Sequence, residues 1–69
     1  MLKAGIYRHY KGKDYRVIGL AKHSETLEDL VVYEPLHDSE YKLWVRPLKI
    51  FLENVELKGR TVPRFKFLK

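Results

Sequence analysis

The segment from residue 30 to residue 51 constrains the fold of this chain more than any other. Its sequence, LVVYEPLHDSEYKLWVRPLKIF, holds the densest apolar run and the only tryptophan. Residues 30–33 are rich in β-branched and aromatic side chains, which is typical of a strand. Pro35 lacks an N–H, so this strand should end there or lie at an edge. The polar residues 37–40 predict a turn, and a second strand over residues 41–46 completes an antiparallel hairpin.

The Arg-Pro step at residues 46–47 ends this second strand and predicts the one helical turn. The fixed φ of Pro47 suits the first position of a helix. Leu48, Phe51 and Leu52 lie at helical spacing, so one face would hold all three. A helix of about one or two turns is unstable alone in water. We therefore expect residues 47–53 to pack over one end of a β barrel.

The remaining segments predict further strands. Residues 6–10 and 15–22 flank a turn at Gly12, and residues 55–57 and 61–68 follow the helix, with Pro63 limiting the last strand. Gly19, in the middle of a strand, indicates a bulge or a sharp bend. The fold class predicted is mainly β: a small SH3-like barrel of five or six antiparallel strands with one short helical turn near residues 47–53, forming a single domain over residues 1–69.

Alternation along the strands predicts which side chains share a face. In residues 41–46, Trp44 and Arg46 would lie on one face of the strand, and Leu43 and Val45 on the other. In residues 15–22 the odd-numbered residues would form one face, and Ile18 and Leu20 would belong to the opposite face.

Charge is distributed unevenly along the chain. The net charge is +5, but residues 1–22 and residues 58–69 each carry +5, and the middle, residues 23–57, carries −5. If the two ends of the chain lie together, they form one positive face. The simpler interpretation is ordinary solubility charge.

The chain has no cysteine. This excludes disulfides and thiolate ligands and fits a reducing, cytoplasmic compartment. No apolar run approaches the roughly 20 residues that span a bilayer, and the N-terminal residues lack a signal-peptide core. We therefore expect a cytoplasmic protein with no membrane association.

Four short motifs resemble a known bacterial family. They are YRHYKG at residues 7–12, AKHSET at 21–26, VVY at 31–33 and LWVRP at 43–47. In this order and at this spacing they are similar to domain-of-unknown-function family 1653, as are Phe51 and residues 62–65. The resemblance implies an SH3-like barrel and no established activity. Family members often carry arginine at the position of Lys22, and an aromatic residue followed by glycine near residues 36–37, so the hairpin tip here should differ in shape.

The polar and aromatic residues of these motifs are the candidate ligand-binding residues. Trp44 and Arg46 would form a stacking platform beside a cation, and loops on small barrels often carry function. The full candidate set is His9, Lys11, His23, Ser24, Glu25, Thr26, Trp44 and Arg46. The alternative is that Trp44 fills the core, Arg46 pairs with Glu25 or Glu34, and residues 24–26 only hydrogen-bond their own loop.

Catalysis and metal binding are not predicted. His9 and His23 diverge in a hairpin that turns at Gly12, and a zinc site needs three or four convergent ligands. Ser24 follows His23 directly, so in an extended chain the two side chains point to opposite faces. No catalytic residue, metal or cofactor is therefore expected.

The sequence favours a non-catalytic binding module. It would recognise a peptide, a small ligand or a partner protein through the loop of residues 23–29 and the strand face of Trp44 and Arg46. The alternative is a nucleic-acid-binding domain that uses the basic N- and C-terminal segments, although the acidic middle argues against it. Edge strands limited by proline, and exposed tyrosines, fit a monomer or a weak homodimer.

Overall fold

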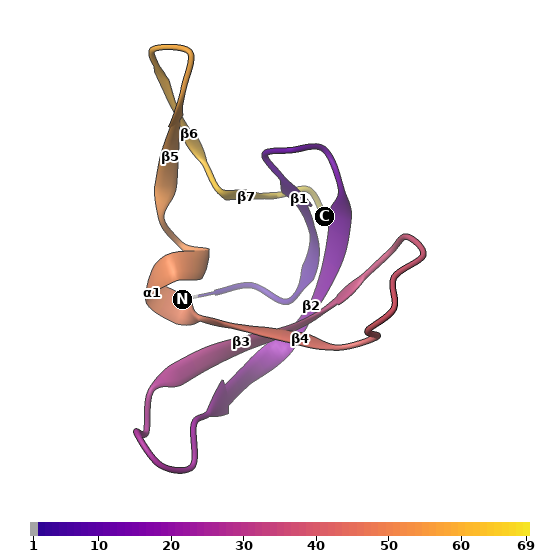
Figure 1. Cartoon of the computed structure of the whole chain (residues 1–69), viewed down its shortest axis with the longest axis vertical. Helices are drawn as coiled ribbons and strands as arrows, with labels where there is room; N and C mark the ends of the chain where they lie inside the picture. The colour runs from indigo at the N-terminus through magenta and orange to yellow at the C-terminus, as the bar shows by residue number, and fades with distance from the viewer. Residues whose placement is uncertain (1) are drawn as a thin grey trace.

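The computed structural model describes residues 2–69 as seven strands and one short helix (Figure 1). The predicted mainly β fold with a single helical turn is confirmed. One strand more than expected is present, because Pro63 and Arg64 divide the last predicted strand in two. The elements are β1 (Gly5–His9), β2 (Asp14–Lys22), β3 (Asp29–Pro35), β4 (Trp44–Pro47), α1 (Leu48–Phe51), β5 (Asn54–Leu57), β6 (Arg60–Pro63) and β7 (Phe65–Phe67).

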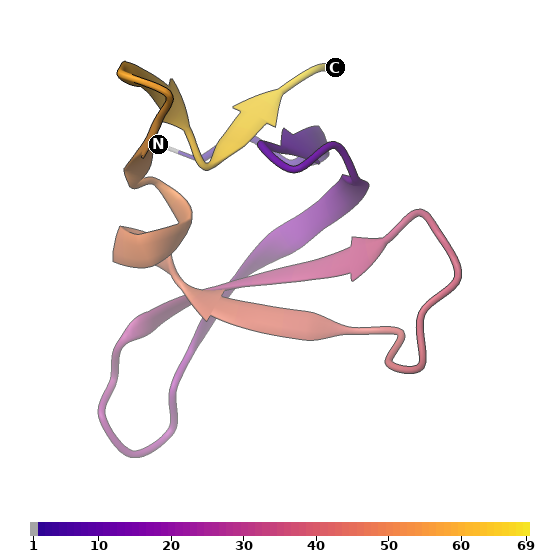
Figure 2. The ribbon, with the colours of Figure 1, turned by 45° about the horizontal axis from the view of Figure 1, so that its top comes forward.

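Five strands form one antiparallel sheet in the order β4-β3-β2-β1-β7. This sheet curls, with β1 and β7 facing β3 and β4 and α1 at one side (Figure 2). The expectation of a closed barrel wall is wrong, since within residues 2–69 β4 and β7 remain the two edges. The chain between them forms α1 and a separate β5–β6 hairpin, whose strands pair with each other and project away from the sheet (Figure 1).

A bulge in β2 bends the sheet at the predicted glycine. Val17 pairs with Tyr33, but Gly19 pairs with Val32, so Ile18 is the extra residue. The bulge also shifts the alternation of side chains by one position. Leu20 therefore pairs with Val31 and shares its face, contrary to the uninterrupted alternation predicted for this strand.

Pairing of β1 with β7 brings the two ends of the chain together. Arg8 lies opposite Lys66, and the backbone N–H of Ile6 donates to the carbonyl of Lys69 at 2.9 Å. Gly5 allows this approach: its φ is +143°, and a Cβ there would lie 2.7 Å from the Lys69 carbonyl oxygen. The two basic segments of the sequence thus become neighbours in space.

Helix α1 covers part of the concave face of the sheet. Phe51 is 1% exposed and stacks on Phe65, with ring centroids 4.1 Å apart and planes at 6°. Leu48 packs against the same core, as predicted. Leu52 does not: it is 58% exposed, because the helix ends at Phe51 and Leu52 forms its C-cap. The buried core consists of Tyr7, Val17, Val31, Tyr33, Phe51 and Phe65.

Candidate functional site

The concave face continues beyond α1 into an uncovered cleft. In the β3–β4 register Tyr33 lies opposite Trp44 and Val31 opposite Arg46. Facing partners in a sheet share a side, so Trp44 and Arg46 lie on the core face, as their alternation predicts. The cleft has a volume of about 200 Å³ and is lined by Tyr15, Tyr33, His37, Ser39, Trp44 and Arg46.

Arg46 is the central cation of this cleft. It is half-buried, its Nε donates to the hydroxyl of Tyr33 at 3.3 Å, and its guanidinium lies 5.5 Å from the ring centre of Phe65. Within residues 2–69 no carboxylate lies within ion-pair distance of it. The alternative pairing with Glu25 or Glu34 is wrong, because neither carboxylate forms an ion pair with Arg46 and Glu34 accepts from Arg16 at 3.2 Å. Arg46 therefore keeps guanidinium N–H groups free for an acceptor.

Aromatic rings form the walls of the cleft. Trp44 is 42% exposed and meets Tyr41 edge to face at 5.7 Å, so the alternative that Trp44 fills the core is wrong. Tyr15 contacts both Tyr33 and His37 edge to face, each at 5.4 Å. These rings offer a planar ligand a stacking surface beside a cation.

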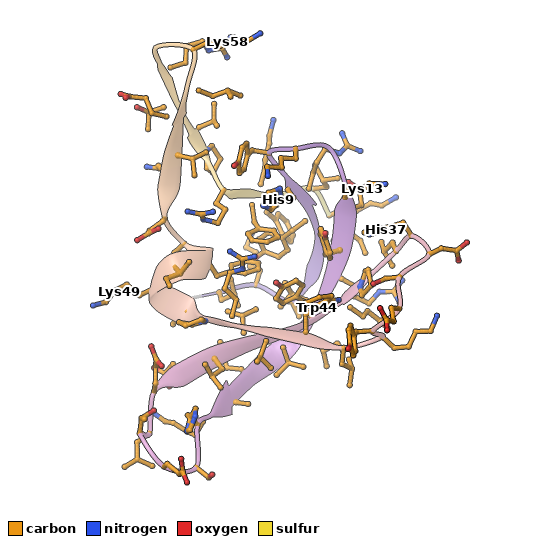
Figure 3. All side chains as sticks on the ribbon, in the orientation of Figure 1. His9, Lys13, His37, Trp44, Lys49 and Lys58 are labelled. Atoms are coloured by element: carbon orange, nitrogen blue, oxygen red, sulfur yellow. The ribbon has the colours of Figure 1, made fainter. Side chains whose placement is uncertain are left out.

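His37 contributes an unused polar atom. Its Nδ1 is buried and has no hydrogen-bond partner within the described chain. Buried polar atoms are nearly always hydrogen-bonded, and an exception calls for an explanation such as a ligand or water. His37 and Ser39 both belong to the β3–β4 connection, and His37 and Trp44 are labelled in Figure 3.

His9 lies at the end of β1 on the same concave side. Its ring packs on Phe65 at 4.9 Å and on Tyr15 at 6.5 Å, and its Nδ1 accepts from the backbone N–H of Lys11 at 3.2 Å. Burial lowers the pKa of His9, and the charges of Arg46, Lys11 and Arg64 lower it further. The lowered pKa of His9 therefore reflects mainly the partial burial of its ring, and to a smaller extent the three nearby cations.

Five candidates remain. Lys11 lies in the turn between β1 and β2, and it is not among the residues that line the cleft. The other four, residues 23–26, lie in the turn between β2 and β3. This turn lies at the end of the molecule opposite the β5–β6 hairpin (Figure 1). Nδ1 of His23 accepts from the backbone N–H of Glu25 at 3.1 Å and of Thr26 at 3.4 Å, so it is not directed at the hydroxyl of Ser24. The hydroxyl of Thr26 accepts from the N–H of Glu28 at 3.2 Å. The structure thus separates residues 23–26 from the Trp44 and Arg46 face, and these residues fix the shape of their own turn.

Four cleft residues were not among the predicted candidates: Tyr15, Tyr33, His37 and Ser39. The sequence holds a signal for the two tyrosines, since alternation places Tyr15 with Val17 and Tyr33 with Val31 on the core face. It holds no comparable signal for His37 and Ser39, which read as ordinary turn residues.

Comparison with known proteins identifies the family. The model of a protein family of unknown function, DUF1653, matches residues 5–67. The chain belongs to the DUF1653 family. A crystal structure of a DUF1653 protein from Bordetella bronchiseptica superposes with a TM-score of 0.92 at 38% sequence identity, covering 97% of this chain and 87% of that one. No curated protein matches the chain. The resemblance predicted from the four motifs is confirmed, and DUF1653 as a family has no assigned function.

Residues 2–69 lack two further features. No cluster of three or more histidine, aspartate or glutamate side chains is arranged to hold a metal ion. No helix in this part of the chain is long and apolar enough to cross a membrane. A cytoplasmic location stays a prediction of the sequence.

Proposed function

We propose that this DUF1653 protein is a non-catalytic binding module whose cleft takes a small ligand with an anionic group and a planar ring. The observation that supports the proposal most strongly is the state of Arg46. It is half-buried among aromatic side chains, bonds only the Tyr33 hydroxyl, and has no carboxylate partner in the described chain. A guanidinium in this setting favours a carboxylate or phosphate.

The surrounding residues would determine the rest of the recognition. Trp44 supplies an exposed ring for stacking, and His37 a buried polar atom still without a partner. The turn of residues 23–29 is not part of this cleft. The binding module expected from the sequence is therefore narrowed to the face of Trp44 and Arg46.

Titration with small probes tests the proposal. Trp44 is the only tryptophan, so its fluorescence reports directly on the cleft. Benzoate and phenyl phosphate should change this fluorescence saturably, and neutral benzamide should not. Replacing Arg46 with glutamine should weaken the response to both anions at least tenfold. Arg16→Gln is the matched control, because Arg16 is paired with Glu34 on the opposite face of the sheet. An equal response to benzamide, or an unchanged response in Arg46→Gln, would contradict the proposal.

Nucleic-acid binding is the second candidate function. The observation that favours it is the pairing of β1 with β7, which places Arg8 opposite Lys66 and joins the basic ends of the chain. Binding through phosphates should weaken steeply with added salt. Anisotropy titrations with fluorescent single-stranded and duplex oligonucleotides test this at low salt, and the absence of binding to either probe removes this candidate.

A further inference from the structure

A second hollow lies between the β5–β6 hairpin and the β1–β2 turn. It has a volume of about 370 Å³. Its walls are largely apolar: Leu57, Val62 and Pro63 come from the hairpin, and Tyr10 comes from the turn. Two cationic side chains, Arg8 and Lys66, also line it. We call this hollow the hairpin groove.

Further cations lie near the hairpin groove without lining it. Lys58 lies at the tip of the β5–β6 hairpin, and Lys13 lies at the β1–β2 turn on the side away from the hairpin (Figure 3). Within residues 2–69 neither of them, nor Lys66, forms an ion pair, whereas Arg8 pairs with Asp14 at 2.8 Å. An apolar groove with a basic rim is complementary to an acidic segment that carries an apolar side chain.

The β2–β3 turn, at the opposite end of the molecule, is such a segment. In the β2–β3 turn Leu27 is 66% exposed, and its φ is +63°, a left-handed conformation that residues other than glycine adopt uncommonly. Its N–H donates to the carbonyl of His23 at 2.8 Å. Glu25 and Glu28 stand on either side of it, and within the described chain neither is in an ion pair. The turn therefore holds an apolar side chain out in water, between two carboxylates.

Hydrogen bonds within the β2–β3 turn hold Leu27 and the two glutamates in this arrangement in the free protein. Nδ1 of His23 accepts from the N–H groups of Glu25 and Thr26, and the N–H of His23 donates to the carbonyl of Glu28 at 2.9 Å. A preorganised loop loses little conformational entropy on binding. Residues 23–26 do not line the cleft, but they hold the turn in the conformation that exposes Leu27.

We propose that the β2–β3 turn of one copy docks into the hairpin groove of a second copy. Leu27 enters between the apolar walls, and Glu25 and Glu28 face the basic rim. The β2–β3 turn and the β5–β6 hairpin, which forms one wall of the hairpin groove, lie at opposite ends of the molecule (Figure 1). The contact therefore joins unlike surfaces, head to tail. In the resulting dimer one copy keeps a free groove and the other keeps a free turn. Further copies can therefore add at both ends of the assembly.

Sedimentation velocity of the full chain tests the proposal. At low salt the weight-average mass should rise above the 8.3 kDa of one chain as the concentration increases. It should return to that of the monomer at about 0.5 M salt, where the Debye length is only about 4 Å. Leu27→Ser and Lys66→Glu should each raise the concentration needed for association at least tenfold.

Mixing the two variants gives the sharper result. Leu27→Ser keeps a working groove and Lys66→Glu keeps a working turn, so an equimolar mixture should associate again and stop at two copies. Leu52→Ser and Lys49→Glu are matched controls, since Leu52 and Lys49 are exposed on or next to α1, and these variants should associate like the unmodified chain. Circular dichroism confirms that each variant is folded.

Three results would overturn the proposal. The first is a chain that stays monomeric at low salt up to millimolar concentration. The second is association that Leu27→Ser leaves unchanged, or that the mixture fails to restore. The third is a monomer that binds a single-stranded oligonucleotide and loses this binding in Lys66→Glu, which would assign the hairpin groove to nucleic acid instead.

Discussion

The two halves of the concave sheet face differ in what covers them. In one half α1 seals Tyr7, Val31 and Phe65 beneath Phe51, and all four are buried. In the other half Tyr15, Trp44 and Arg46 line an open cleft. Both halves belong to the same sheet and carry aromatic side chains from neighbouring strands.

The difference shows that the length of α1 decides which aromatic residues on this face are buried. Those beneath the helix belong to the core, and those beyond it stay exposed in the cleft. Helix α1 spans four residues, Leu48–Phe51, and contributes a single fully buried side chain. A helix of this length covers only part of a curled sheet. The uncovered part leaves its aromatic surface and the partly buried guanidinium of Arg46 open to solvent.

The largest expected effect is the loss of the covered half. Phe51→Ala removes the ring that stacks on Phe65 and should destabilise the chain by about 3–5 kcal/mol, most of the stability of a domain of this size. Urea denaturation followed by Trp44 fluorescence measures it. Leu52→Ala is the control, and its exposed side chain should change stability by about 0.5 kcal/mol at most. A loss below about 1 kcal/mol for Phe51→Ala would show that α1 is not the lid of the core.

The next effect concerns Gly5 in β1, against which the C-terminal end of the chain packs. A Cβ at Gly5 would meet the Lys69 carbonyl, whereas a Cβ at Gly12 meets nothing within 4 Å, although both glycines have positive φ. Gly12→Ala therefore carries backbone strain alone, and Gly5→Ala adds a clash that should cost about 1–3 kcal/mol more. Thermal or urea unfolding of the two variants measures the difference. Equal stabilities would show that the Lys69 carbonyl does not lie against Gly5 in solution.

Trp44 should behave unlike Phe51. Because it is partly exposed on the open half, Trp44→Ala should cost about 1 kcal/mol or less. The variant should stay folded by circular dichroism and lose binding of phenyl phosphate, measured by calorimetry because the fluorophore is gone. If the Trp44→Ala variant were unfolded, Trp44 would be a core residue, and the two halves of the face would not differ in the way described.

The smallest effect is the pH dependence from His9, which lies where the two halves meet. Its folded-state pKa is lowered, chiefly by burial and then by Arg46, Lys11 and Arg64. The folded state therefore disfavours protonation, so stability should be complete above the unfolded pKa of about 6.5 and fall as the pH drops below it. Urea midpoints between pH 7.5 and pH 5 measure this slope, which should be shallower in His9→Gln. An identical slope in both proteins would show that His9 is not the source of this pH dependence.

Local patterns of this sequence were enough to predict most of the strands. Pro35 and Pro47 end strands where expected, Gly19 lies at the predicted bulge, and Trp44 shares its face with Arg46. These features depend on the backbone chemistry of single residues and on alternation, both of which are written in neighbouring positions.

The candidate site was predicted only in part. Trp44 and Arg46 line the cleft, and His9 lies next to it, but residues 23–26 do not, although they belong to the same set of motifs. Their place depends on the length and direction of the β2–β3 hairpin, which carries the turn to the far end of the molecule. His37 enters the cleft because its loop folds back against Tyr15, a contact between distant parts of the chain.

The sequence by itself determined the mainly β class, the strand ends at Pro35 and Pro47, the bulge, the helical turn after Pro47 and the family. The tertiary structure alone decided that the sheet stays open, that Phe51 is covered and Leu52 exposed, and that Arg46 has no carboxylate partner among residues 2–69. The physical reason is range. Backbone preferences act between neighbours in the chain, whereas coverage and ion pairing depend on which distant side chains the curl of the sheet brings together.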